Sequence, residues 1–434
     1  MGAEFTLHAS PEADGQAGPR MAEALEHVRA RITAEGMRVS APEGTVGAPW
    51  PVCPVVTVLD PRAEPVLRAR VSTVVRCLER VVCRYAHDTE LQSLLGLPSE
   101  PHWWMLRHPA PERLGVDFCR LDLLGDTLGT VRVLEFNASS PGGVLSLGMM
   151  ARFWRESALG HLLEEAGATT AAPVEADRWF ADWLTSHGRR HGIAHDEGRR
   201  VGLLYSPPSR KFEFNLMEGQ LRRHGLLPVV QPLAQGVETL GKVRLGYLKY
   251  VPSADDPRAY REIFHSRFRD ADLVVPNVPV ARFVAENKLC LAVLSDPRFR
   301  RLFTEYERAA LDALVPYSRK LGDGITETEA VARRTGLVLK APYGCRGEQV
   351  TIGAHTSPGS WEAAVRAPQH RGWLLQQRVI AGTLSAGPNS CYRDLVVPVL
   401  DGRVVGYGSR TSTDPVVNGA RGGAAASVFA PHPL

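Results

Sequence analysis

Acidic and amide side chains gather in one short segment in the first third of the chain. Arg120-Leu-Asp122 precedes Glu135-Phe-Asn137, which leads into Ala-Ser-Ser-Pro-Gly-Gly143. On a β-strand Glu135 and Asn137 would project from the same face, and Asp122 lies about a hairpin's length upstream. Carboxylate and amide oxygens form a hard ligand set that suits magnesium, which also accepts ligands from substrate phosphates. The spacing therefore predicts a magnesium site and nucleotide chemistry.

Two lysines in the second half of the chain are suited to phosphate binding. Lys288 follows Asn287 at a predicted helix, and Lys340 ends an apolar strand predicted over 336–340. Ammonium groups at such positions can hold phosphate oxygens. Taken alone, Lys340 is more typical of a solvent-exposed strand end, so the phosphate interpretation depends on its neighbours.

The residues that follow offer the other parts of a nucleotide site. Glycines in the turn Tyr-Gly-Cys-Arg-Gly at 343–347 would let backbone N–H groups close over phosphates, although Gly-x-x-Gly alone usually marks only a turn. Gln376, on a strand predicted over 373–377, offers backbone and amide groups to an adenine edge. Neither GxxxxGK[ST] nor GxGxxG occurs, so a P-loop and a dinucleotide fingerprint are unsupported.

The C-terminal region predicts a β-hairpin that ends in an arginine. It runs from Arg393-Asp394 to Arg410, and apolar runs flank a turn at Asp401-Gly402. In isolation Arg410 is typical of a surface residue. Its place in the longer pattern favours a functional role.

Length and composition restrict the class of protein. The 434 residues, 44% hydrophobic and 23% charged, suggest roughly two to four globular domains. The formal charge of +4 comes from scattered arginines, which argues against a nucleic-acid partner. No apolar stretch suits a membrane helix, no signal-peptide pattern appears, and the seven cysteines form no CxxC pair. We expect a cytoplasmic protein with no membrane partner.

Hydrophobic periodicity predicts the elements that position these side chains. The first region is expected to be helical and peripheral, with an apolar stripe along 62–85. Strands over 116–124 and 130–136 flank a Gly-Asp-Thr-Leu-Gly turn, which places the acidic cluster on a hairpin. Further helices are predicted over 21–35, 148–165 and 174–187, and a βαβ layer begins with elements at 200–205, 211–224, 226–231 and 273–277.

Histidines recur every fourth position at His187, His191 and His195, which on a helix would form a column of metal ligands. Gly188 and Gly192 weaken such a helix. The flanking arginines are typical of a solvated linker, which we favour over a metal site here.

In combination, these motifs resemble the ATP-grasp superfamily of carboxylate-amine ligases. The family's usual order is matched by Asn287-Lys288, Lys340 with Gly344 to Gly347, Gln376, Arg393-Asp394 to Arg410, and Asn418 to Gly423. The family's last step, an Asp and Glu-x-Asn followed by Pro-Gly, stands near the front of this chain instead. This order resembles the circularly permuted ATP-grasp enzymes, the group that includes glutathionylspermidine synthetase. The resemblance covers roughly 115–145 and 200–425.

The resemblance implies an α/β (α+β) fold: a circularly permuted ATP-grasp fold with a Rossmann-like layer before it and a helical N-terminal region. The implied domains are a helical region at 1–112, a permuted metal-ligand part at 113–170, a Rossmann-like domain at 197–285, a lid subdomain at 286–375 and a core subdomain at 376–434.

The resemblance also implies roles for individual residues. Asp122, Glu135 and Asn137 would hold two Mg²⁺ ions, and Arg120 and Arg410 would stabilise the transferred phosphoryl group. The residues implied in ATP binding are Lys288, Lys340, Tyr343, Gly344, Arg346, Gly347, Gln376, Arg393 and Asn418. A substrate carboxylate would take the γ-phosphate to give an acylphosphate and ADP, and an amine would then form an amide or peptide bond.

Other functions stay open at this stage. The same fold serves phosphotransferases without ligation, which need no amine, and a non-catalytic nucleotide-binding protein would more often have lost part of the set. The chain lacks the amidase domain of the glutathionylspermidine enzymes, so their substrates cannot be transferred to it. We expect a small-molecule carboxylate and an amine, such as an amino acid or peptide-like metabolite, and a homodimer as the default assembly.

Overall fold

The computed structural model describes most of the chain. The described residues are 7–9, 17–39, 47–168, 172–206, 212–235, 240–250, 273–344, 347, 349–386, 389–414, 417 and 423–430. Within these ranges, no helix combines the length and apolar character that a bilayer crossing requires.

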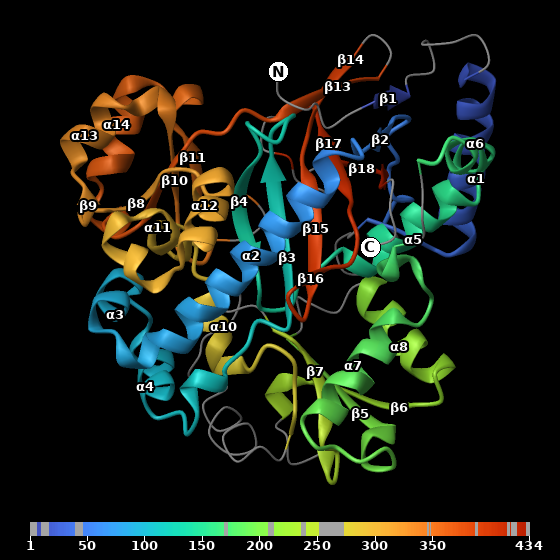
Figure 1. Ribbon diagram of the computed structural model, residues 1–434, viewed down its shortest axis with the longest axis horizontal. Coiled ribbons are helices and arrows are strands. Elements are labelled where there is room, and N and C mark those ends of the chain that lie inside the picture. Colours follow the sequence, from blue (N-terminus) through green and yellow to red (C-terminus); the bar gives the residue numbers. More distant parts are fainter. Residues whose placement is uncertain are drawn as a thin grey trace.

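A four-stranded antiparallel sheet lies at the centre of the molecule (Figure 1). The strand order is β16-β15-β3-β4, so the predicted acidic hairpin pairs with the predicted C-terminal hairpin. Its turn at Asp401-Gly402 has positive φ at both residues, as a tight hairpin turn requires. The strands are β3 (Phe118–Leu124), β4 (Arg132–Asn137), β15 (Leu395–Leu400) and β16 (Arg403–Val404).

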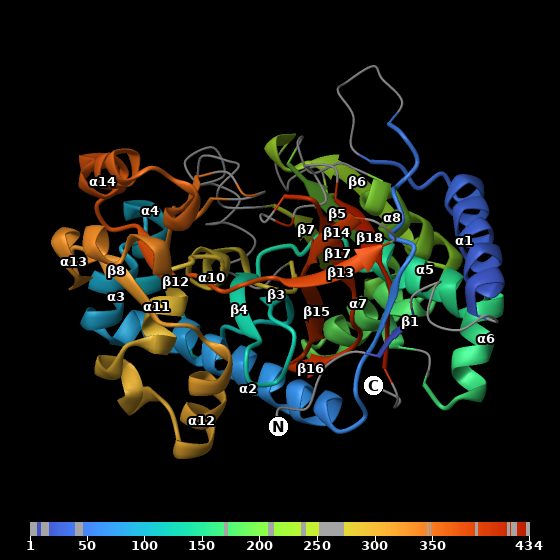
Figure 2. The same ribbon diagram turned by 90° about the horizontal axis from the view of Figure 1, so that it is seen from above.

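Helix α2 (Ala63–Arg84) crosses the central sheet (Figures 1 and 2). Val71, Val74 and Leu78 are fully buried, in one hydrophobic cluster with Leu121 of β3 and Val397 of β15. The expectation of a peripheral first region is therefore wrong for α2, because its apolar stripe forms part of the main core. Five further helices contribute buried residues to the same cluster: α3 (Thr89–Leu95), α4 (Ser99–Leu106), α10 (Pro279–Ala285), α11 (Cys290–Ser295) and α12 (Glu305–Leu314).

A five-stranded sheet with two helices forms a unit of its own at one side of the molecule (Figure 1). Its order is β11-β10-β12-β8-β9, and a separate hydrophobic cluster around Trp361 holds the helices on it. We call residues 318–377 the five-stranded unit. Its elements are β8 (Ser318–Leu321), β9 (Gly324–Ile325), α13 (Glu327–Ala332), β10 (Leu337–Lys340), β11 (Val350–Ile352), α14 (Pro358–Arg366) and β12 (Leu374–Gln377).

A parallel sheet of order β6-β5-β7 confirms the predicted βαβ layer. The strand predicted over 273–277 is reduced to an isolated bridge between Val274 and Leu245, and β7 was not predicted. The helix predicted over 174–187 is displaced towards the C-terminus, as α7. The elements are α7 (Trp179–Arg190), β5 (Arg200–Tyr205), α8 (Phe212–Arg223), β6 (Leu227–Pro232) and β7 (Leu245–Lys249).

The remaining helices lie on the side opposite the five-stranded unit (Figure 1). α1 packs against α5 and α6 through a third hydrophobic cluster that contains Val28 and Trp154. The helix predicted over 148–165 is broken in two because Ser157 accepts a hydrogen bond from Gly160 N (3.3 Å) and caps the second part. The helices are α1 (Ala17–Ala34), α5 (Val144–Arg155) and α6 (Ala158–Glu165).

Two small sheets complete the fold beside the central one. One has the order β13-β14-β17-β18, and the other has the order β1-β2-β19. The strands are β1 (Leu7–Ala9), β2 (Val56–Val58), β13 (Gly382–Ala386), β14 (Asn389–Arg393), β17 (Ser409–Ser412), β18 (Ala424–Ala426) and β19 (Val428–Phe429).

Candidate active site

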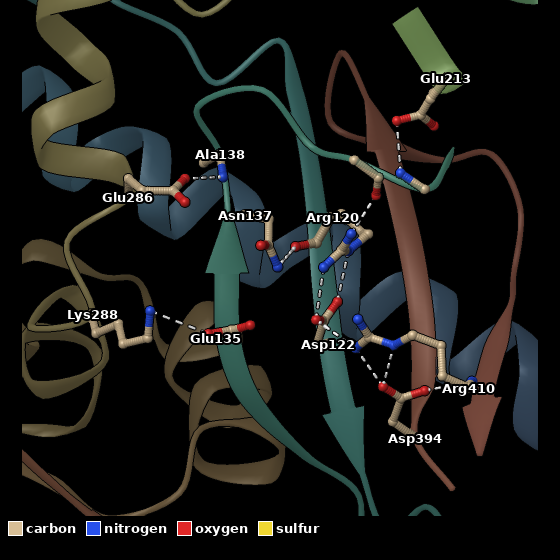
Figure 3. Close-up of polar contacts among 12 residues, drawn as sticks. Arg120, Asp122, Glu135, Asn137, Ala138, Glu213, Glu286, Lys288, Asp394 and Arg410 are labelled. Atoms are coloured by element: carbon tan, nitrogen blue, oxygen red, sulfur yellow. Dashed lines mark hydrogen bonds and ion pairs between the residues drawn. The ribbon is translucent and has the colours of Figure 1, made fainter. Parts of the chain in front are cut away.

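The predicted acidic cluster lies on one face of the β3–β4 hairpin (Figure 3). Asp122 is directly opposite Glu135, and Arg120 is directly opposite Asn137. Residues two apart on a strand share a face, and so do directly opposed residues of an antiparallel pair. The strand pairing therefore brings all of these side chains together, as the sequence predicted.

Asp122 is almost fully buried, with 2% of its side chain exposed, between two arginines. Arg120 donates Nε and Nη2 to its two oxygens, at 2.8 and 2.9 Å, and Arg410 donates Nη2 at 2.7 Å. Burial alone would raise the pKa of Asp122, but the two guanidinium groups lower it to about 2. The carboxylate is thus ionised throughout the physiological range.

Asp394 orients Arg410 from the start of β15 (Figure 3). It accepts hydrogen bonds from the backbone N of Arg410 at 2.7 Å and from Nε at 2.8 Å. The sequence places Asp394 in the predicted hairpin but indicates no role for it. The signal that could have indicated a role is the position of this carboxylate directly before an apolar strand, because a charge buried there needs a partner of opposite charge.

A β-bulge connects the hairpin to the five-stranded unit. Asp122 pairs with Glu135 but the next residue of β3 pairs with Val133, so Leu134 has no opposite residue. The Leu134 carbonyl accepts a hydrogen bond from Lys340 Nζ (3.1 Å), and that of Val133 accepts one from Gln376 Nε2 (3.3 Å). The edge strand β4 is therefore covered by side chains of β10 and β12.

Lys340 is buried, which differs from the strand-end lysine that the isolated residue suggested. Its Nζ also donates to Gln376 Oε1 at 2.5 Å, so both ends of the Gln376 amide are engaged. Burial lowers the pKa of Lys340 to about 8; Glu135 and Asp122 oppose this shift and Lys288 adds to it. Lys340 therefore changes charge close to physiological pH.

Lys288 extends towards the same face of the hairpin (Figure 3). Its Nζ lies 3.2 Å from Glu135 Oε2 and donates to Gly344 O at 2.5 Å. The sequence predicts a helix at Asn287-Lys288, but the two residues lie in the turn between α10 and α11. Tyr343 donates its hydroxyl to Phe283 O at 2.6 Å, which anchors the turn at its start.

The loop 138–143, which follows β4, is held by charged residues that sequence reasoning missed. Glu286 accepts hydrogen bonds from Ala138 N and Ser139 N, both at 2.8 Å. Glu213 accepts one from Gly143 N at 2.8 Å, and Lys249 Nζ donates to two carbonyls of the loop, each at 3.0 Å. Since these partners come from distant segments, no local spacing indicated them. Arg120 Nη1 also donates to Gly142 O, which joins the loop to the site.

Some predicted residues lie outside this cluster. Arg393 is buried against the far end of the hairpin, where Nη2 is 3.1 Å from Asp126 Oδ1 and Nη1 is 3.4 Å from Thr57 Oγ1. Arg346 and Asn418 lie outside the described residues. Gly347 has a φ of +70°, a conformation that favours glycine.

The oxygen donors on the hairpin fit Mg²⁺. Glu135 uses Oε2 for Lys288, and Asn137 uses Nδ2 to donate to Arg120 O at 3.4 Å, so Glu135 Oε1 and Asn137 Oδ1 are not used in these contacts. Both are hard donors beside an ionised Asp122. Asp122 Oδ2 accepts hydrogen bonds from both arginines, whereas Oδ1 accepts one from Arg120 Nε and keeps a second lone pair for an ion.

Similarity to known proteins establishes the fold. No protein-family model and no curated protein sequence matches the chain. A solved structure of a glutathione synthetase-like effector from Globodera pallida, in its apo form, aligns with a TM-score of 0.61 at 12% identity, over 97% of this chain and 98% of that one. The chain has an ATP-grasp-type fold. A putative γ-glutamylcysteine synthetase from Methylobacillus flagellatus aligns over 83% and 85% of the two chains at 13% identity, but its TM-score of 0.40 supports no argument.

The ATP-grasp-type fold agrees with the order of motifs along this chain. The mixed α and β architecture, the parallel layer and the pairing of an N-terminal hairpin with C-terminal strands confirm the predicted fold class. The individual domain boundaries stay predictions.

Proposed function

We propose that the protein is an ATP-dependent, ADP-forming ligase that joins a carboxylate to an amine through an acylphosphate. The observation that supports this best is the pairing of Asp122 with Glu135 on a hairpin face that also receives the cations Arg120, Arg410 and Lys288. Carboxylates beside converging cations are what a metal-dependent phosphoryl transfer requires.

In this proposal the carboxylates of the hairpin hold the metal. We assign Mg²⁺ to Asp122, Glu135 and Asn137, where two ions, when bound, would offset the charge of the ATP phosphates. Lys288 and Lys340 bind phosphate oxygens. Their present partners, Glu135 and the Leu134 carbonyl, then become secondary contacts.

Arg410 and Arg120 stabilise the transferred phosphoryl group and then the tetrahedral intermediate formed by the amine. Asp394 fixes the plane of the Arg410 guanidinium, so the group needs little reorganisation during the reaction. Glu286 and Glu213 hold the loop 138–143, and with it Gly142, the backbone partner of Arg120. We assign no general base for the amine.

The substrates we propose are an amino acid or small peptide and an amine. The solved structure with the similar fold is described as glutathione synthetase-like, which supports a peptide-type product at the level of chemical class. The cytoplasmic location and the homodimer stay predictions.

The test is to trap the acylphosphate. The protein is incubated with ATP, Mg²⁺ and a panel of carboxylates, with and without hydroxylamine, and both ADP and hydroxamate are measured. Glu135→Ala should abolish both signals and leave the fold intact, since its side chain is 30% exposed and not part of a core. The matched control is Glu305→Ala, an exposed carboxylate on α12.

The outcomes separate the candidate functions. Hydroxamate that depends on Glu135 supports carboxylate activation and identifies the acid. ADP without hydroxamate would favour phosphoryl transfer to another acceptor. Full turnover in Glu135→Ala would remove the metal assignment, and a lack of ATP binding would overturn the proposal.

A further inference from the structure

A second cluster of possible metal ligands lies where β3 begins, away from the candidate active site. Asp117 directly precedes β3, Asp401 lies in the turn between β15 and β16, and His187 lies on α7. One ligand atom from each residue lies within 4.8 Å of the other two. The backbone joins two of the residues, because Asp401 N donates to Asp117 O at 2.8 Å.

His187 has a buried nitrogen that lacks a hydrogen bond. Its side chain is 2% exposed, Nδ1 makes no hydrogen bond, and Asp117 Oδ1 lies 3.6 Å away. A neutral imidazole nitrogen is an ordinary ligand of metal ions. A buried nitrogen without a partner is unfavourable, and a metal ion would satisfy it.

The surrounding groups leave coordination atoms available. Asp117 accepts Asn277 N through Oδ2 at 2.7 Å, and Asp401 binds Arg190 through Oδ1 at 2.7 Å. In each carboxylate the other oxygen is not used in that contact. The His191 ring packs against His187, with the ring planes tilted by 37° and the centroids 4.5 Å apart. Glu79 adds negative charge near both aspartates, which Arg190 and Arg76 partly offset.

The column of three histidines, which the sequence analysis did not favour, does not form. Helix α7 ends at Arg190, so His191 and His195 lie beyond it and are exposed. His187 instead faces carboxylates from the central sheet. The carboxylates that face His187 are brought there by the fold, and the spacing of the histidines four residues apart plays no part.

We propose that Asp117, His187 and Asp401 bind a first-row divalent transition ion of the Zn²⁺ class, which fastens α7 to the end of the central sheet. An imidazole nitrogen among carboxylates favours such an ion over Mg²⁺ or Ca²⁺. The ligand atoms lie within 4.8 Å of one another, and His187 Nδ1 and Asp117 Oδ1 are 3.6 Å apart, so an ion with ligands at about 2 Å needs at most a small movement of Asp401. Asp401 can make this movement because it is 34% exposed in a turn.

The site is tested by titrating Co²⁺ into the metal-free full-length chain, without a purification tag, in excess Mg²⁺. The protein used for the titration carries Glu135→Ala, so that the proposed metal site on the β3–β4 hairpin does not bind the added Co²⁺. We expect saturable binding of one equivalent with a visible ligand-field band, and a rise in the melting temperature. Zn²⁺ should displace Co²⁺.

Three substitutions locate the site. His187→Gln should weaken Co²⁺ binding by at least about a hundred-fold, since even outer-shell partners account for ten- to hundred-fold. Asp401→Asn should weaken it about tenfold, and asparagine tolerates the φ of 47° at this position. Asp323→Asn is the matched control, because Asp323 is 35% exposed and pairs with Arg298 at 3.0 Å.

Each outcome decides the proposal. Loss in His187→Gln and weakening in Asp401→Asn, with no change in Asp323→Asn, support it. Affinity unchanged in Asp401→Asn, or the absence of saturable Co²⁺ binding to the folded Glu135→Ala protein, would overturn it. Should His187→Gln fail to fold, the turn variant Asp401→Asn still decides.

Discussion

The two sides of the candidate active site are built differently. On the side of the central sheet, Asp122 and Asp394 are buried and bound to Arg120 and Arg410 by charge-assisted hydrogen bonds. On the side of the five-stranded unit, two side chains bind backbone carbonyls of the edge strand β4, and the unit has its own hydrophobic cluster.

This difference indicates a division of tasks. Buried ion pairs fix the positions of charges but become costly when one partner is lost. Most buried apolar side chains of the five-stranded unit pack in its own cluster and Leu374 of β12 joins the main core, so the unit can shift relative to the hairpin with little disturbance of that core. We infer that the sheet side sets the geometry of the reaction, and that the five-stranded unit adjusts to the nucleotide.

The largest effect should follow from breaking the ion pairs on the sheet side. Arg410→Ala leaves Asp394 buried without its main partner, and we expect a loss of about 3–5 kcal/mol in the free energy of unfolding. Urea denaturation measures it. Arg403→Ala, an exposed arginine of β16, serves as control. A loss below about 1 kcal/mol would show that water compensates Asp394.

A second effect concerns acid stability. The folded pKa of Asp122, about 2, lies below its ordinary value of 3.8, so its contribution is present above about pH 4 and is lost as pH falls towards 2. The loss should be about 2 kcal/mol. The free energy of unfolding is measured between pH 5 and pH 2 for the unchanged protein and for Asp122→Asn. The variant should not show this loss of stability, because asparagine does not titrate. Parallel curves for the two proteins would contradict the shifted pKa.

On the other side of the site, the effect should appear in nucleotide binding. Lys340 has a pKa of about 8, so its charge, and its attraction for phosphate, is lost as pH rises above that value. We expect ATP affinity to fall about tenfold between pH 7 and 9.5. Calorimetric titration measures it. In Lys340→Arg the dependence should vanish, because arginine stays charged; an equal dependence in both proteins would exclude Lys340.

The smallest effect should come from the ion pair at the end of the hairpin. Asp126 is 55% exposed, so Asp126→Ala should change stability by less than about 0.5 kcal/mol and leave ATP affinity unaltered. Thermal unfolding and ATP titration test this. A clear fall in ATP affinity would show that Asp126 positions Arg393 for the nucleotide, the role that the family resemblance implies for that arginine.

The sequence predicted the parts of the site that depend on local spacing. Glu135 and Asn137 follow the period of a strand, and Asp122 is a hairpin away, so the strand pairing brings them together. The same rule predicted the Asp401-Gly402 turn and the βαβ layer.

The rest depends on partners that are distant in the chain. Glu213 and Glu286 bind the loop 138–143 from other elements, and the burial of Lys340 is due to β4. The apolar stripe of α2 predicted a helix, but it did not indicate that this face packs against the central sheet. Hydrophobic periodicity alone predicts one continuous helix through Ser157, whereas Ser157 caps a new helix in the structure.

The bulge at Leu134 has a consequence for how this protein could be altered. Deleting Leu134 would leave a regular ladder in which Asp122 still opposes Glu135, so the metal-facing set would keep its orientation. The deletion would remove the carbonyl that receives Lys340. The inserted residue therefore supplies one of the two backbone carbonyls through which β4 binds the five-stranded unit, and this contact can be removed without changing how the carboxylates are presented.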